Sequence, residues 1–236
     1  MTGAVKSSVR RERARATRLR ILRAAAALFA EHGYAGTTMD AIARAAGVAV
    51  QTVYLVFHTK PELLIETLMV QAWGPDPRAP AARSWIQEAA EAPDGARRLA
   101  IAVDAGVEIY RRAAPLFPAV ISASSVEPDV RTAWQRIAEE RHASMSQLVG
   151  RMHDRGELRE GLPAAHATDI VDGLHRHDLY LAFIRERGWS VETFKAWLYA
   201  TLCHQLLPAA VATAALATDS PAVTGTSFRA ALAELP

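Results

Sequence analysis

Several features that define other classes of protein are scarce or missing in this chain. It contains one cysteine, Cys203, which excludes an intramolecular disulfide and is expected to be a small buried side chain and not a redox centre. No apolar stretch reaches the ~18 residues that a membrane-spanning helix needs. The N-terminus is polar and arginine-rich, without the apolar segment typical of a signal peptide. We therefore expect a well-folded cytoplasmic protein that has no membrane partner.

Signatures of catalysis are also missing. The sequence contains no glycine-rich phosphate loop, no Gly-x-Ser-x-Gly and no His-Glu-x-x-His. An enzyme needs a nucleophile or base together with a group that orients it, and no such set is visible. We expect a protein that is not an enzyme and that uses no cofactor.

Basic side chains are concentrated at the N-terminal end. The first sixty residues carry ten basic and three acidic side chains, a formal charge of +7, whereas the whole chain carries only +2. Because lysine and arginine release counterions when they contact a polyanion, this segregation predicts a polyanionic partner for the N-terminal part. The acidic remainder favours a different role downstream. For residues 1–9, a solvated disordered tail is the preferred alternative.

The segment from Gly36 to Leu64 predicts two short helices joined by a tight turn. Thr37 is a candidate N-cap for a helix that begins near Thr38. Gly47 follows that helix at the position where a left-handed residue is needed to end it. Two helices in this arrangement form a helix-turn-helix, a common DNA-reading device.

The second of these helices is expected from about Ala49 to Phe57. Helical spacing places one group of side chains on the core face: Val53, Val56 and Phe57. The opposite face carries Gln51, Tyr54, Leu55 and His58. An exposed helix with these groups suits a major groove.

The segment Thr59-Lys60-Pro61-Glu62 predicts the beginning of a further helix, because it has the pattern of a capping box with proline in the first turn. Its free N–H groups and Lys60 are suited to contact a phosphate. A plain helical hairpin inside an all-α domain is the alternative, and the flanking basic arm favours DNA binding over it.

From about residue 14 to residue 66 the sequence resembles the DNA-binding region of the TetR family of bacterial transcriptional regulators. The features that carry the resemblance stand in order at the family's spacings: Ala46-Gly47-Val48, Thr52, Tyr54, Phe57, Lys60 and Leu63-Leu64. The resemblance implies that Thr38, Tyr54 and Lys60 contact phosphates. It also implies that bases are read from Ala49, Val50, Gln51 and Leu55.

Two departures from the family pattern affect base reading. Val50 and Leu55 stand where many members carry a polar or basic side chain, and Val56 replaces a frequent aromatic residue. Direct hydrogen-bond readout is therefore expected from Gln51 and Thr52, with apolar contacts to thymine methyl groups from Val50 or Leu55. The full set of expected DNA-binding residues is Thr38, Ala49, Val50, Gln51, Thr52, Tyr54, Leu55, His58 and Lys60.

Strand patterns are almost absent downstream, so we expect an all-α protein with an N-terminal three-helix helix-turn-helix domain and a larger helical ligand-binding and dimerisation domain. The expected divisions are a basic disordered arm (1–13), the helix-turn-helix domain (14–60), the effector-binding and dimerisation domain (61–208) and a disordered or weakly helical tail (209–236). The later helices are expected at about 82–92, 95–113, 115–124, 128–156, 163–176, 178–187 and 191–207.

The resemblance further implies an effector pocket among the C-terminal helices. The candidates for its lining are Tyr110, Phe117, Trp134, Met145, Met152, His175 and Tyr180. Ordinary core packing is the alternative, and it is the more common role of such side chains.

Two histidine–aspartate pairs, His166 with Asp169 and His175 with Asp178, share a spacing of three residues. Structural zinc sites normally assemble four ligands, and nothing in the sequence brings these pairs together. We expect no metal site. Solvated or capping polar residues at a helix break before Asp178 are the preferred interpretation, and histidines that contact an effector are an intermediate one.

Two hypotheses for the function follow. The first is a ligand-responsive transcriptional regulator, a repressor that a small molecule releases from a palindromic double-stranded DNA operator. It would act as a homodimer through the helices at about 163–176 and 191–207, with exposed apolar groups at Ile170, Leu174, Trp197 and Leu198. The alternative is an effector-independent DNA-binding or architectural protein whose C-terminal domain serves only assembly.

Overall fold

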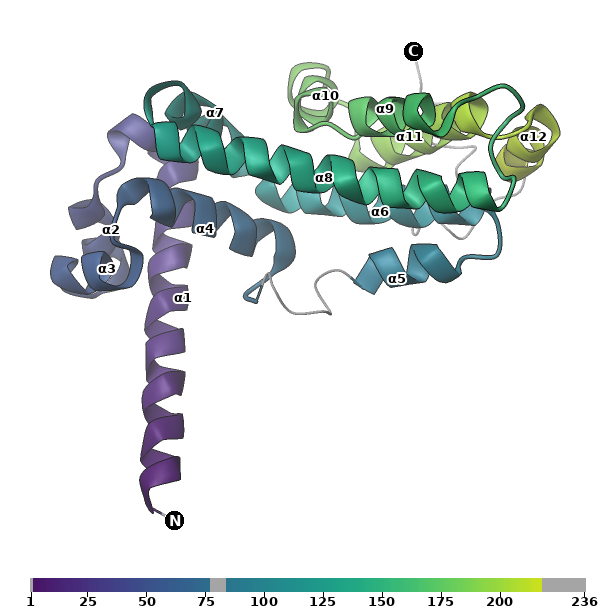
Figure 1. Cartoon of the computed structure of the whole chain (residues 1–236). Coiled ribbons are helices and arrows are strands. Elements are labelled where there is room, and N and C mark those ends of the chain that lie inside the picture. Colours follow the sequence, from purple (N-terminus) through teal and green to yellow (C-terminus); the bar gives the residue numbers. More distant parts are fainter. Residues whose placement is uncertain (1, 77–83, 218–236) are drawn as a thin grey trace. The chain divides into compact units, whose positions relative to one another are not determined.

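The computed structural model of the chain describes residues 2–76 and 84–217 (Figure 1). Every regular element in these two ranges is helical, so the prediction of an all-α protein is confirmed. The helices are α1 (Thr2–Gly36), α2 (Met39–Ala46), α3 (Val50–Phe57), α4 (Lys60–Trp73), α5 (Ser84–Glu91), α6 (Gly95–Ala113), α7 (Phe117–Val126), α8 (Pro128–Asp154), α9 (Ala164–Leu174), α10 (His177–Leu181), α11 (Val191–Leu206) and α12 (Ala209–Ala217). Short turns of other helical types, η2 (Ala114–Leu116) and η3 (Ala182–Glu186), join α6 to α7 and extend α10.

The chain divides into two compact units. The first comprises residues 1–78 and 115–136, and the second comprises residues 79–114 and 137–236. In the first unit α1 packs against α2, α4 and α7. The boundary expected after residue 60 therefore lies inside this unit, because the apolar side chains of Leu63, Leu64 and Leu68 hold α4 against the helix-turn-helix.

Helix α1 begins at Thr2, so the arm expected to be disordered over residues 1–13 is helical in the structure. No proline interrupts the sequence there, and arginine is among the better helix formers. The helix is broken near its other end at Gly33, whose φ of 67° lies in the left-handed region that glycine tolerates best.

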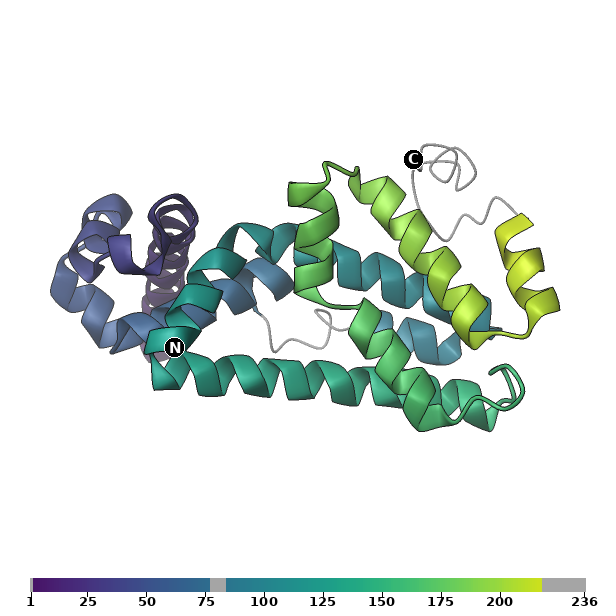
Figure 2. The same ribbon diagram turned by 90° about the horizontal axis from the view of Figure 1, so that it is seen from above.

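In the second unit α6 packs against α5, α10, α11 and α12, and α11 also packs against α9 (Figure 2). Its core includes Leu99 and Val103 from α6 and Phe194 and Leu202 from α11. Cys203 is also buried, as expected, and burial raises the pKa of its thiol to about 12. The thiol is thus a packing group in this fold.

The second unit also buries an arginine that the sequence analysis did not single out. The Arg98 side chain is fully buried, and its guanidinium donates to the carbonyls of Ala89, Ala90 and Ala92 at the end of α5 and pairs with Glu157. Planar guanidinium groups suit such multiple contacts. Arg98 therefore supplies donors to carbonyls at the end of α5, where the helix itself leaves carbonyls unpaired.

For most of the helices expected after residue 81, both predicted ends lie within a few residues of the ends in the structure. The expected helix at 178–187 is instead α10 followed by the π-helical turn η3. Within the expected tail, residues 209–217 form α12, and residues 218–236 lie outside the described residues. Within the described ranges no single helix is long and apolar enough to cross a membrane.

Candidate nucleic-acid interface and effector site

The turn into α2 is capped by Thr38 and not, as the sequence analysis expected, by Thr37. The Thr38 hydroxyl accepts a hydrogen bond from the Ala41 N–H. Thr37 is buried, and its hydroxyl donates to the Gly33 carbonyl, which the break in α1 leaves without its helical partner. The two adjacent threonines thus have different roles: Thr38 caps the beginning of α2, and Thr37 holds the end of α1.

Gly47 ends α2 in the predicted way. Its φ of 63° and ψ of 43° are those of a left-handed residue, and its N–H bonds to carbonyls of α2. Ala49 then lies at the N-cap of α3 in an extended conformation, without a side-chain cap. The tight turn places α3 directly after α2, as a helix-turn-helix requires.

Helix α3 has the two faces predicted from its spacing. Val53 and Phe57 are fully buried and Val56, expected on the same face, is half-buried, while Tyr54 is 49% and Leu55 78% exposed. Gln51 and His58 are also exposed, as are Thr38 at the N-cap of α2 and Ala49 at the N-cap of α3, whereas Val50 and Thr52 are half-buried. An exposed leucine on an otherwise anchored helix is a group that a partner surface can cover.

His58 closes α3 in an unusual backbone conformation. Its φ is 41° and its ψ is −50°, and the Thr59 N–H bonds back to the Phe57 carbonyl. This arrangement is a γ-turn of the rarer, strained kind. It lets Thr59 cap α4 immediately, with its hydroxyl accepting from the Glu62 N–H as the capping box predicts. The sequence carries no glycine that would have signalled the tight turn.

Lys60 lies at the junction of three segments of the first unit. Its Nζ donates to the carbonyls of Tyr34 and Thr37, each at 2.9 Å, and lies 3.9 Å from the centre of the Tyr34 ring. Burial lowers the pKa of Lys60, and the charge of Glu127 opposes that effect. The phosphate contact expected of Lys60 remains a proposal, and this geometry leaves one of the three N–H groups for it.

Arg18 of α1 contacts the C-terminal end of α3, the proposed recognition helix. Its guanidinium lies 4.6 Å from the centre of the Phe57 ring and forms an ion pair with Glu66 of α4. A cation over an aromatic face is attracted by the ring quadrupole. Helical spacing alone places Arg18 on the core side of α1, but the identity of its partners depends on the tertiary fold.

The residues expected around an effector are divided between the two units. Phe117 and Trp134 belong to the first unit, where their ring centres lie 6.1 Å apart. The second unit contains Tyr110, Met145, Met152, His175 and Tyr180. The spacing of Trp134 and Met145 on one stripe of α8 did not reveal that the two units divide this helix.

His175 is the most unusual of these side chains. It is the C-cap residue of α9, at the expected helix break, but its side chain is buried and not solvated, and its ring lies against Gly106 of α6. Neither ring nitrogen has a hydrogen-bond partner within the described residues, although carbonyls of Val171 and Ala102 lie close by. Burial lowers the pKa of His175 to about 4, so the ring is neutral at pH 7. A neutral imidazole has one donor and one acceptor to satisfy.

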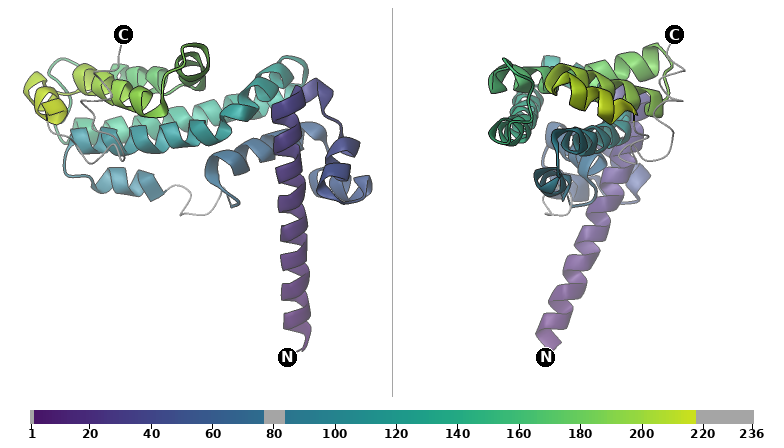
Figure 3. Two further views of the ribbon diagram at one scale, coloured as in Figure 1. Left: turned by 180° about the vertical axis from the view of Figure 1, so that it is seen from behind. Right: turned by 90° about the vertical axis from the view of Figure 1, so that its right-hand side faces the viewer.

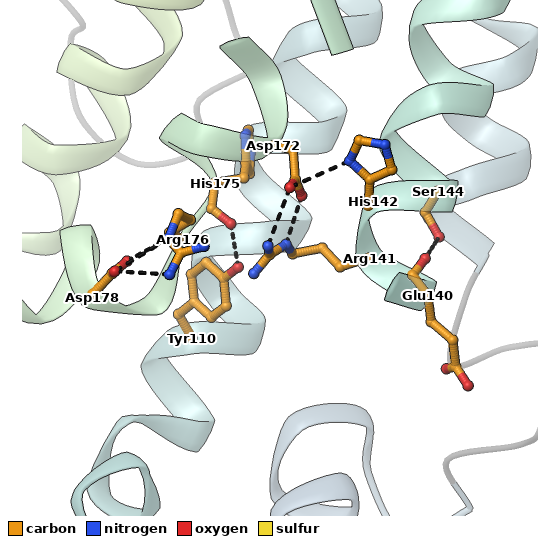
Figure 4. A network of polar contacts seen from close by, with 9 residues as sticks. All are labelled: Tyr110, Glu140, Arg141, His142, Ser144, Asp172, His175, Arg176 and Asp178. Atoms are coloured by element: carbon orange, nitrogen blue, oxygen red, sulfur yellow. Dashed lines mark hydrogen bonds and ion pairs between the residues drawn. The ribbon is translucent and has the colours of Figure 1, made fainter. Parts of the chain in front are cut away.

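Charged groups surround this histidine (Figure 4). The Tyr110 hydroxyl donates to the His175 carbonyl at 2.5 Å, and Arg141 of α8 makes two hydrogen bonds to Asp172 of α9. Burial raises the pKa of the Tyr110 phenol, and the charge of the Arg141 guanidinium opposes that effect. Asp178 pairs with Arg176. The second unit therefore combines a neutral histidine with a phenol and a paired arginine.

Comparisons with known proteins agree with this geometry. Residues 21–67 match the model of the bacterial regulatory proteins of the tetR family. A comparison with curated protein sequences gives no match. The matched segment contains α2, α3 and the turn between them, and it reaches into α1 and α4.

Solved structures extend the likeness to most of the chain. One, from Mesorhizobium loti and assigned to the TetR-family transcriptional regulators, has 25% identity and a TM-score of 0.64, over 80% of this chain and 95% of its own. NalD of Pseudomonas aeruginosa, the secondary repressor of the MexAB-OprM multidrug efflux pump, has 24% identity and a TM-score of 0.65, over 84% and 99%.

A third structure, of a protein from Saccharomonospora viridis assigned as a transcriptional regulator and solved in complex with choline, has 20% identity and a TM-score of 0.65, over 81% of this chain and 97% of its own. The matched family and the proteins of these structures are described as transcriptional regulators and not as enzymes. The helix-turn-helix, its match to the family model and the fold shared with these structures thus identify residues 21–67 as the DNA-binding region of the tetR family of bacterial regulatory proteins, in a chain that shares the fold of TetR-family regulators.

Proposed function

We propose that this chain is a ligand-responsive transcriptional repressor that binds a palindromic operator as a homodimer and leaves it when a small molecule binds the second unit. The observation that carries the DNA-binding part is the exposed face of α3, with Gln51, Tyr54 and Leu55 presented by a helix whose other face is anchored in the core. Glutamine can pair with adenine through two hydrogen bonds, and leucine can cover a thymine methyl group. Such a protein acts in the cytoplasm, where the DNA is.

The remaining proposed DNA contacts surround this face. Thr38 is exposed at the N-cap of α2, Ala49 at the N-cap of α3 and His58 at the end of α3. Tyr54 and Lys60 are proposed to meet phosphates, with the Lys60 ammonium already positioned by two backbone carbonyls. Phosphate contacts would fix the register of the helix in the groove, and Gln51 and Thr52 would read the sequence.

His175 supports the ligand-responsive part of the proposal. Buried polar atoms normally have partners, and those that lack them need a reason. A small molecule with a hydroxyl or N–H group would satisfy the acceptor nitrogen of the neutral ring. Tyr110 and Tyr180 lie in the same unit, and their rings are 6.1 Å apart, so part of the surroundings is aromatic. A ligand acts as a switch only if it binds the two states of the protein with different affinities.

The dimer is proposed to form through α9 and α11. Ile170, Leu174 and Trp197 are half-exposed, as an apolar contact with a second copy would require, whereas Leu198 is buried within its own unit and is withdrawn from the predicted interface. One recognition helix reads few base pairs, so two copies on two half-sites supply the affinity that a regulator needs.

The test of this function begins with selection of the preferred DNA from a random duplex library by the full-length chain. We expect a palindrome with half-sites about one helical turn or a multiple of it apart. The selected duplex then serves in a binding assay with a library of small polar and aromatic molecules. Release by at least one compound supports the repressor, and failure to select any sequence refutes it. A chain that selects an operator but responds to no compound would favour the alternative of an assembly-only second unit.

A further inference from the structure

The N-terminal turns of α1 form a strongly basic helix. Among the described side chains of this segment, Arg10, Arg11, Arg13, Arg15 and Arg20 are all exposed. Glu12 is the single acidic residue among the first twenty. These turns extend away from the other helices of the first unit (Figure 3). The positive charges of these arginine side chains therefore face solvent and are not neutralised by ion pairs in the core.

One face of this helix continues the side of α1 that meets the recognition helix. Arg18 contacts Phe57, the last residue of α3, and pairs with Glu66. Arg15 lies three residues before Arg18 and Arg11 four residues before Arg15, so helical spacing puts the three on one face. At 1.5 Å of rise per residue, Arg11 lies about 10 Å beyond Arg18 along the axis. Arg13 and Arg20 lie on the opposite side of the same helix.

Like charges at this spacing repel one another. Arg11 and Arg15 are four residues apart on the helix, an arrangement that weakens an isolated helix when the two charges have the same sign. A row of phosphates placed against them would reverse that effect and release counterions. A polyanion that lies along the side of α1 on which α3 ends would thus relieve the repulsion between Arg11 and Arg15.

We propose that the N-terminal helix extension is a second DNA-contact element, in which Arg11 and Arg15 bind backbone phosphates next to the groove that α3 enters. This inference rests on the proposed DNA-binding function. DNA is favoured over other polyanions because the two arginines belong to the same compact unit as α3 and continue the face against which α3 ends. The contacts carry no sequence information and act through affinity and salt dependence.

The test compares two double variants of the full chain that lose equal charge. Arg11→Gln/Arg15→Gln removes the proposed contacts, and Arg13→Gln/Arg20→Gln is the matched control on the opposite face. Binding to the selected operator is measured as a function of salt concentration. Each lost phosphate contact lowers the slope of log affinity against log salt by about 0.9, so the loss of two contacts in each protomer of the operator-bound dimer predicts a fall of about 4 for the first variant and a clearly smaller change for the control.

Two further measurements make the outcome decisive. Circular dichroism checks that both variants keep the helix, and Arg11→Lys/Arg15→Lys, which keeps the charge, should keep most of the slope. An equal loss in both glutamine variants would mean diffuse attraction, and no loss in either would mean no contact; each result overturns the inference. Because wild-type binding is measured first, a chain that selects no operator overturns the proposed function itself, whereas normal selection with unchanged slopes overturns only this inference.

Discussion

The hydroxyl of Tyr34, in the last turn of α1, donates a 2.9 Å hydrogen bond to the carboxylate of Glu127, which caps the end of α7. The same tyrosine presents its carbonyl and its ring to Lys60, the first residue of α4. Burial, together with the hydrogen bond and charge of Glu127, raises the pKa of the Tyr34 phenol. One side chain thus joins α7 to the beginning of α4 within the first unit.

Removing this hydroxyl should weaken the first unit. Tyr34→Phe keeps the ring over Lys60 but leaves the Glu127 carboxylate without its donor, which should lower the free energy of unfolding by about 1–2 kcal/mol. Urea denaturation measures the change. Tyr54→Phe removes the same atom from an exposed ring and should leave stability unaltered. Equal stability of the Tyr34 variant and the wild type would show that the bond is not formed in solution.

Replacing Gln51 should alter base recognition selectively. Gln51→Ala is expected to cost roughly 1–3 kcal/mol on the selected operator and to relax the preference at one position of each half-site. Competition binding against duplexes with single base changes is the measurement. Gln135, which is exposed on α8, provides the control Gln135→Ala, for which no change is expected. A Gln51 variant that weakens all sequences equally would contradict the proposed orientation of α3.

Lys60 should contribute to stability as well as to binding. Lys60→Met keeps the aliphatic stem but removes the donor to two carbonyls, so we expect a lower free energy of unfolding by about 1–3 kcal/mol. If the third N–H meets a phosphate, the variant also binds cognate and non-cognate DNA more weakly, with a salt slope reduced by about 1 for each protomer and by about 2 for the operator-bound dimer. Loss of stability with an unchanged slope would assign Lys60 a purely structural role.

The stability of the second unit should depend on pH through His175. Its folded pKa of about 4 lies below the ordinary value of 6.5, so the unfolded chain binds the proton more readily between these two pH values. Stability is therefore fully present above pH 6.5 and falls as the pH decreases toward 4, by at most about 3 kcal/mol. Burial also lowers the pKa of His177, which acts in the same direction.

The variant His175→Leu should remove most of this pH dependence, because it leaves His177 as the main buried group that titrates. The free energy of unfolding is measured between pH 7 and pH 4.5 for the wild type, for His175→Leu and for the exposed control His166→Gln. An unchanged pH profile in the leucine variant would show that water or a partner reaches the His175 ring. The same variant should lose the response to any compound found to release the operator.

Dimer formation should depend on the half-exposed apolar side chains of α9. Ile170→Lys places a charge on the proposed interface, where it would be buried without a partner in the dimer but hydrated in the monomer. We expect dissociation at micromolar concentration in sedimentation experiments, together with weaker operator binding. His166→Gln, at an exposed position of the same helix, should remain dimeric. A monomeric wild-type chain with full operator affinity would contradict the dimer.

The sequence predicted those features that depend on local chemistry. Gly47 ends α2 and the Thr59 box begins α4, because each needs only neighbouring backbone groups. Which of two adjacent threonines caps α2 could not be read locally, since Thr37 is held by the carbonyl that the kink at Gly33 frees.

Long-range packing decided the remaining differences. The burial of His175 depends on α6, whose Tyr110 donates a hydrogen bond to the His175 carbonyl and precedes it by 65 residues in the chain. Similarly, Phe117 and Trp134 share a helical pattern with the C-terminal helices but belong to the compact unit that contains α3. Periodicity shows that a side chain is buried, and it does not show against which helix.

Gly106 fixes where the His175 ring can lie. A Cβ atom at position 106 would come within 2.9 Å of the His175 Cδ2, so any other residue there would push the imidazole aside. A substitution at position 106 would therefore change the proposed ligand response by moving the His175 ring, even when every residue in contact with the ligand stays the same. In the design of a biosensor, Gly106→Ala would add one methyl group beside the His175 ring, and it would change which molecule is detected without altering the operator that is read.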